Sequence, residues 1–85
     1  MVSLIFVSHS NEFAEATSKY IKEITKSKTS IAFCGGIGND KKEFGTDPID
    51  ILNTIEEVYN DDGVIIFCDM GSALISSELS ISMLD

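Results

Sequence analysis

Three apolar runs of strand length constrain most strongly how this chain can fold. They are Ser3–Ser8, Ser30–Cys34 and Val64–Cys68, and isoleucine, valine and phenylalanine are frequent in them. A continuous apolar run, as opposed to an alternating one, is typical of a strand that is covered on both faces. Segments with helical spacing of apolar residues separate and follow these runs. The chain therefore predicts the order strand, helix, strand, helix, strand, helix.

The predicted helices cover Asn11–Lys26, the segment from Pro48 to near Asn60, and Ala73–Leu84. Asp47 can cap the second helix, because proline suits the first helical position that follows it. The apolar residues expected to pack are Phe13, Ala16, Thr17, Tyr20, Ile21 and Ile24 in the first helix, Ile51, Leu52, Ile55, Val58 and Tyr59 in the second, and Leu74, Ile75, Leu79 and Met83 in the third.

This alternation predicts an α/β fold in three α/β/α layers, with a parallel sheet between the helices. The commonest start of such a fold places the first strand between the second and the third, which is the strand order 2-1-3. A crevice then opens at the carboxyl ends of the first and third strands, where the chain reverses direction. We expect the loop Ser8–Ser10 to lie there beside the loop Asp69–Ser72.

Composition limits the size and the partners of this fold. The 85 residues allow one domain, residues 1–85, and 44% hydrophobic with 24% charged residues is ordinary for a folded chain. A net charge of −8 disfavours nucleic acid and anionic membrane surfaces as partners. The apolar start lacks a basic leader and no later run approaches spanning length, so we predict a cytoplasmic protein without membrane insertion.

His9 is the candidate catalytic nucleophile. It is the only histidine, and it directly follows the first predicted strand. An ordinary imidazole has a pKa of about 6.5, so much of it is neutral and nucleophilic at neutral pH. The helix expected from Asn11 would direct amide groups and a partial positive charge toward this loop, which favours a phosphoryl group. The alternative is that this histidine is a helix cap or a packed side chain.

Asp69 ends the strand expected beside His9. Its carboxylate can accept one ring N–H, fix the tautomer and leave the other nitrogen to attack phosphorus. The alternative for Asp69 is a cap on the next helix. Ser10, Gly71 and Ser72 are the candidate phosphate-binding residues, although Ser72 alone is better interpreted as an N-cap and Gly71 alone as a tight turn.

Spacing argues against a nucleotide cofactor and a disulfide. Neighbouring strand residues point to opposite faces, so Cys68 and Asp69 should diverge, which argues against a metal site. The glycine-rich loop Gly35–Thr46 follows the second strand and lacks both the dinucleotide fingerprint and a Gly-Lys-Ser/Thr sequence, so we expect a flexible rim beside the crevice. Cys34 and Cys68 are expected roughly 9–10 Å apart, beyond the limit of roughly 7 Å for a disulfide. We interpret both as small buried apolar residues.

Three segments together resemble one known family. They are the start MVSLIFVSHS, the segment GIGND followed by FGTD and an apolar helix ending in IEEV, and VIIFCDMGSALISSE. They are similar to the phosphotransferase subunit of bacterial phosphoenolpyruvate-dependent dihydroxyacetone kinase, which belongs with the mannose-type enzyme IIA domains of the sugar phosphotransferase system. The resemblance covers essentially the whole chain, and the pairing of VSHS with DMGSA is its specific part.

The resemblance implies a phosphotransferase that works through a phosphohistidine and needs no cofactor. The family's histidine, which takes phosphate from the phosphocarrier protein HPr, matches His9. The aspartate that orients it matches Asp69, and the serine on the phosphate side matches Ser72. The recipient would be ADP held by the nucleotide-binding kinase subunit, and the family implies a homodimer.

Two alternatives stay open at this point. One is a mannose-type sugar-transport domain with a IIB domain as recipient, against which the DMGSA segment argues, and the other is a non-catalytic interaction module. Family members continue beyond the position of Asp85 with a further strand and more helices. The third strand is then a bare apolar edge, so we expect a fragment, a truncated protein, or a chain whose edge is covered by another chain. A monomer of this length is expected to be poorly stable.

Overall fold

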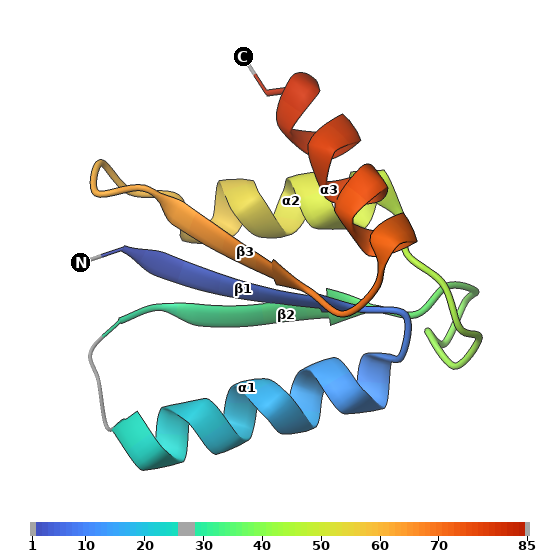
Figure 1. The fold of residues 1–85 in the computed structure, drawn as a ribbon, viewed down its shortest axis with the longest axis horizontal. Helices are drawn as coiled ribbons and strands as arrows, with labels where there is room; N and C mark the ends of the chain where they lie inside the picture. Colours follow the sequence, from blue (N-terminus) through green and yellow to red (C-terminus); the bar gives the residue numbers. More distant parts are fainter. Residues whose placement is uncertain (1, 26–28, 85) are drawn as a thin grey trace.

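The computed structural model describes residues 2–25 and 29–84, and in these ranges three strands alternate with three helices (Figure 1). The elements are β1 (Ser3–Ser8), α1 (Asn11–Thr25), β2 (Ile31–Gly35), α2 (Pro48–Val58), β3 (Val64–Cys68) and α3 (Gly71–Ser82). The predicted order is confirmed, and β1 and β3 have the predicted bounds. Lys26, the expected end of the first helix, lies outside the described residues. None of the described helices has the length and apolar character needed to cross a bilayer.

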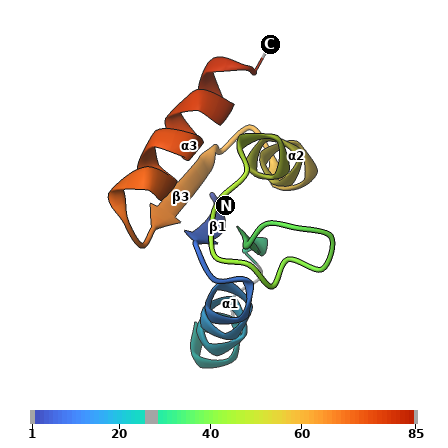
Figure 2. The same cartoon turned by 90° about the vertical axis from the view of Figure 1, so that its right-hand side faces the viewer.

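The described strands form a parallel sheet in the order β2-β1-β3. Val7 of the central strand lies opposite Cys34 on one side and Cys68 on the other. Helix α1 covers one face of the sheet, and α2 and α3 cover the other (Figures 1 and 2). The predicted three-layer α/β/α fold with strand order 2-1-3 is confirmed.

The main core lies between the sheet and the helices α2 and α3. Its buried members are Ile5, Val7, Cys34, Ile51, Ile55 and Ala73. Alternate residues of β1 point to this side, which is why Ile5 and Val7 belong to it. At the start of α2 the Asp47 carboxylate accepts a hydrogen bond from the Ile49 amide at 3.0 Å, ahead of a proline at the first helical position. The predicted cap is confirmed.

Helix α3 packs through small side chains, and here the predicted packing face is wrong. Among the side chains of α3 that the structure describes, Ala73, Ser77 and Ser80 are buried. The predicted residues Leu74, Ile75 and Leu79 are instead 50–68% exposed. Small residues allow α3 to approach α2 closely, and the Ser80 hydroxyl donates to the Pro48 carbonyl at 2.6 Å. Apolar residues and serines are distributed around the whole circumference of α3, so its sequence carries no apolar stripe that marks the inner face.

Strand β3 forms an edge of the sheet, because its only described strand partner is β1. On the side of α1, Ile65 and Phe67 are each 47% exposed, and the Phe67 ring stacks on Phe6 with centroids 5.3 Å apart. Helix α1 buries Ala14 and Ser18, neither of which was predicted to pack, and leaves Phe13 59% exposed, so its predicted apolar stripe does not form the buried face. The expected apolar edge strand is thus present in the described part of the chain.

The two cysteines differ in their surroundings, although both are thiols. Burial, and after it the negative charge of Asp50, raise the pKa of the Cys34 thiol to about 12. Cys68 is only half-buried, with its Sγ 3.5 Å from the Ser77 hydroxyl, so the prediction of two buried cysteines holds for Cys34 alone. Within the described residues, no three His, Cys, Asp or Glu side chains gather in a way that could hold a metal ion.

Cys34 is expected to react with thiol reagents only when the protein unfolds, because the thiolate is the reactive form. The Cys68→Ser variant, which keeps only Cys34, should react at least about 10²-fold more slowly near neutral pH than the Cys34→Ser variant. An aromatic disulfide reagent reports both rates by absorbance. Denaturant should make the two rates similar, and equal rates in the folded proteins would contradict the protection of Cys34.

Candidate functional site

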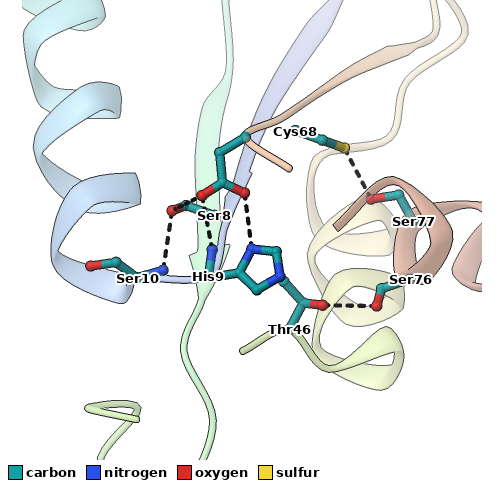
Figure 3. A network of polar contacts seen from close by, with 8 residues as sticks. Ser8, His9, Ser10, Thr46, Cys68, Ser76 and Ser77 are labelled. Carbon is teal, nitrogen blue, oxygen red and sulfur yellow. Dashed lines mark hydrogen bonds and ion pairs between the residues drawn. The ribbon is translucent and has the colours of Figure 1, made fainter. Parts of the chain in front are cut away.

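The carboxyl ends of β1 and β3 lie side by side and carry the candidate site (Figure 3). Val7 lies opposite Cys68 in the parallel register, and the backbone N–H of Asp69 donates to the Val7 carbonyl at 3.2 Å. This extends the ladder by one step, so the residues that follow each strand also come together. The structure places the Ser8–Ser10 loop beside Asp69, at the edge where the order of the strands reverses.

His9 and Asp69 are in direct contact. The imidazole Nδ1 lies 3.1 Å from Oδ1 of Asp69, and the His9 backbone N–H donates to Oδ2 at 3.2 Å. The two side chains are 18% and 25% exposed, so another molecule can reach them. The structure therefore brings together the two residues that the sequence selected as nucleophile and orienting carboxylate. No side chain caps α3, so the Asp69 carboxylate serves His9 and not the helix.

Ser8 supplies a further contact of the carboxylate, one that the sequence reasoning missed. Its side chain is buried, and its Oγ donates to Oδ2 of Asp69 at 2.7 Å. Burial by itself raises the pKa of Asp69, but the hydrogen bonds from Ser8 and His9 outweigh it and hold this pKa below its ordinary value. Asp69 is therefore ionised at neutral pH.

The ionised state of Asp69 determines the tautomer of His9. A carboxylate can only accept hydrogen bonds, so Nδ1 of the imidazole must carry the proton that joins them. In the neutral ring the lone pair then lies on Nε2. The geometry can thus present Nε2 as a nucleophile while Asp69 holds the other side of the ring.

Two helices begin at this edge, and both direct partial positive charge toward it. Helix α1 begins two residues after His9, and Ser10 caps it by accepting the Phe13 N–H at 3.2 Å. Helix α3 begins at Gly71, where an added Cβ would meet nothing within 4 Å. Met70 holds the N-cap position, so the interpretation of Ser72 as N-cap is wrong. Ser72 lies in the first turn, and its side chain is outside the described part.

The glycine-rich loop lies beside the site and is hydrogen-bonded to it. Gly45 donates its N–H to the His9 carbonyl at 2.8 Å, and Gly36 donates to the Gly45 carbonyl at 2.9 Å. The Thr46 and Ser76 hydroxyls lie 2.8 Å apart and join the loop to α3 (Figure 3). The composition of this segment predicted only a flexible rim. The loop instead supports the backbone of His9.

Comparison with known proteins finds matches among components of phosphotransferase systems. The model of the EIIA-man family, described as the PTS system fructose IIA component, matches residues 3–85. The PEP-dependent dihydroxyacetone kinase phosphoryl donor subunit DhaM from Pantoea ananatis is 38% identical over 86 residues, which are 100% of this chain and 18% of that protein. DhaM of the PEP-dependent dihydroxyacetone kinase 2 from Listeria innocua is 34% identical over 85 residues, with 100% of this chain and 66% of that protein covered.

A solved structure agrees with the fold. EF1359, a protein of unknown function, has a crystal structure that is 33% identical, with a TM-score of 0.75 over 100% of this chain and 64% of that chain. The chain spans about a fifth of the length of the Pantoea relative and about two thirds of the Listeria relative. Because the family model matches the chain from β1 to its last residue, the segments of His9 and Asp69 included, this chain belongs to the EIIA-man family.

Proposed function

We propose that this chain is a phosphohistidine carrier, which accepts a phosphoryl group on His9 and passes it on within a dihydroxyacetone kinase system. The observation that carries the proposal is the 3.1 Å contact between His9 Nδ1 and Asp69 Oδ1. The similarity to phosphoryl donor subunits supports the choice of system. We infer HPr as the donor and ADP on the nucleotide-binding kinase subunit as the recipient. Because phosphoenolpyruvate and ADP are cytoplasmic metabolites, we propose that the carrier works in the cytoplasm.

The transfer needs one nucleophile and one orienting carboxylate. The lone pair on His9 Nε2 attacks the phosphorus of phosphorylated HPr, and the bond from phosphorus to the donor breaks with its electron pair returning to the donor. Asp69 keeps the proton on Nδ1 and stabilises the positive charge that develops on the ring. A β-phosphate oxygen of ADP then attacks the same phosphorus. The bond from phosphorus to Nε2 breaks, its electron pair returns to the ring, and ATP leaves.

The phosphoryl oxygens would lie near the helix N-termini at this edge. Gly71 and Ser72 begin α3, whose first amides have no side-chain cap, and amides at such a position favour an anion. Ser10 lies on the other side of His9, at the start of α1. We assign these three residues to phosphate binding. The acidic surface does not oppose this role, because a few backbone amides can hold one anion.

Incubation with phosphoenolpyruvate, enzyme I and HPr is expected to add one acid-labile phosphoryl group, visible by mass spectrometry of the intact chain. The His9→Gln variant should remain unmodified, because glutamine has no nucleophilic ring nitrogen, and its circular dichroism should match that of the unsubstituted protein. A chain that stays unmodified beside a second, active HPr acceptor would contradict the proposal.

The recipient decides between the kinase system and sugar transport. Phosphorylated chain should transfer to ADP when the nucleotide-binding kinase subunit is added, with ATP as the product. Transfer to a IIB protein instead would identify a sugar-transport domain. The homodimer that the resemblance implies stays a prediction, which β3 supports because β1 is its one strand partner in the described part of the chain.

A further inference from the structure

Ser8 lies beneath the site, at the last position of β1, and its side chain is 3% exposed. Its hydroxyl donates to Oδ2 of Asp69 at 2.7 Å and accepts the backbone N–H of Ser10 at 3.1 Å. The amide of Ser10 occupies a lone pair of the hydroxyl, which directs the hydroxyl proton toward the carboxylate. Ser8 is therefore a fixed donor and not a rotating one.

This donor makes the two oxygens of Asp69 inequivalent. Oδ2 accepts from the Ser8 hydroxyl and from the His9 backbone N–H, whereas Oδ1 faces the imidazole Nδ1. A rotation of the carboxylate would break both hydrogen bonds to Oδ2 at once. The two hydrogen bonds to Oδ2 therefore keep Oδ1 of Asp69 opposite Nδ1 of His9.

We propose that Ser8 is a positioning residue for phosphoryl transfer: it anchors Oδ2 of Asp69 so that Oδ1 keeps the proton of His9 on Nδ1 and the nucleophilic lone pair on Nε2. Ser8 acts only through Asp69 and needs no contact with the phosphoryl group. Its effect on the rate rests on the proposed function. Its effect on the tautomer does not, because the tautomer is set in the unphosphorylated protein.

A serine that only satisfies the backbone has different contacts. Ser18 is equally buried, at 1% exposed, but its hydroxyl donates to the carbonyl of Glu15 within the same helix at 2.9 Å. The Ser8 hydroxyl instead reaches a carboxylate 61 positions away in the sequence, in the residue that contacts the imidazole. Ser18→Ala is therefore a matched control, which removes a buried hydroxyl without touching the site.

The tautomer test uses nitrogen NMR on histidine-labelled, unphosphorylated protein, where His9 gives the only pair of ring resonances. Ser8→Ala should shift the neutral ring by about fivefold toward the tautomer with the proton on Nε2, the equivalent of one net hydrogen bond. Ser8→Thr keeps the hydroxyl, so its tautomer ratio should stay near that of the unsubstituted protein. The tautomer ratio of Ser18→Ala should also be unchanged. The cysteine of Ser8→Cys is a weak donor, so its tautomer ratio should lie between those of Ser8→Ala and the unsubstituted protein. An unchanged tautomer ratio in folded Ser8→Ala and Ser8→Cys would overturn the proposal.

The rate test is a double-mutant cycle between Ser8 and Asp69. Ser8→Ala should slow phosphorylation of His9 by about tenfold in the unsubstituted protein. The same change should have less than about a twofold effect when Asp69 is already alanine, because Ser8 then has no carboxylate to anchor. If Ser8→Ala lowered the phosphorylation rate by the same factor with and without Asp69, the role of Ser8 would be overturned. If the chain accepts no phosphoryl group at all, the proposed function fails, and the NMR measurement still decides the role of Ser8.

Discussion

The Asp69→Asn variant is expected to accept a phosphoryl group about 10²- to 10⁴-fold more slowly than the unsubstituted protein. The Ser8 hydroxyl and the His9 backbone N–H both donate to Oδ2, so the asparagine carbonyl is favoured at that position. The NH₂ group then falls where Oδ1 meets Nδ1 and donates to the ring. This moves the ring proton to Nε2 and removes the lone pair that attacks phosphorus. Rapid-quench phosphorylation kinetics measure the loss.

Asp61→Asn is the control for this variant, because it removes the same charge from an exposed turn ahead of β3. It should be phosphorylated at the unsubstituted rate. A similar loss of rate in both variants would mean that net charge, and not the geometry at His9, determines the reaction with the donor. Nitrogen NMR of Asp69→Asn should also show the ring proton on Nε2, which links the loss of rate to its cause.

The loss of folding stability caused by Asp69→Asn depends on pH in a defined direction. The folded protein holds the pKa of Asp69 below its ordinary value, so ionised Asp69 favours the folded state. This contribution is fully present above about pH 3.9, the ordinary pKa of aspartate, and is lost as the pH falls through the lower value of the folded protein. Urea unfolding should show a gap in stability between the two proteins at neutral pH that narrows on acidification.

The Gly35→Ala variant is expected to lose about 2–4 kcal/mol of unfolding free energy and to lose the activity of the site. A Cβ at this position would overlap the carbonyl oxygen of Ser8 and lie 3.2 Å from that of Ser10. Both oxygens belong to the backbone, so β1 has to move away from β2 at the point where it carries His9. Urea unfolding followed by circular dichroism measures the loss, and phosphorylation of His9 reports the displaced loop.

Gly71→Ala is the control for stability, because an added Cβ there meets nothing within 4 Å. It lies in the first turn of α3, where alanine is a better helix former than glycine, so its unfolding midpoint should be unchanged or slightly higher. A Gly35→Ala variant with the same midpoint as Gly71→Ala would contradict the close approach of β1 to Gly35.

The parts of the fold that could be predicted depend on local pattern and on connection rules. The strands are uninterrupted apolar runs, and the capped start of α2 is signalled by Asp47 and the proline that follows it. Right-handed crossovers then leave few strand orders, which is why His9 and Asp69 could be expected at the same edge from their positions alone. Their contact is also short because the parallel register places Val7 opposite Cys68, so the following residues need no long reach.

The features that escaped prediction depend on side-chain detail in three dimensions. The inner face of α3 is made of alanine and serine, and the larger apolar residues around them gave the opposite signal. Ser8 reads as the last residue of a strand, and only the orientation of the Asp69 carboxylate reveals it as a donor. The hydrogen bond from the Gly45 N–H to the His9 carbonyl joins segments far apart in the sequence, and no sequence pattern predicts it.

The two residues of the site come from parts of the chain that are far apart in the sequence. His9 belongs to the β1–α1–β2 unit, whereas Asp69 arrives 60 positions later with β3. Closing that longer loop costs more entropy than pairing β1 with β2, and within the described chain β3 is held along one edge alone. Local opening of β3 and α3 would therefore separate Asp69 from His9 while β1 stays paired with β2. Amide hydrogen exchange in β3 therefore measures the fraction of molecules in which β3 is open and the site is not assembled.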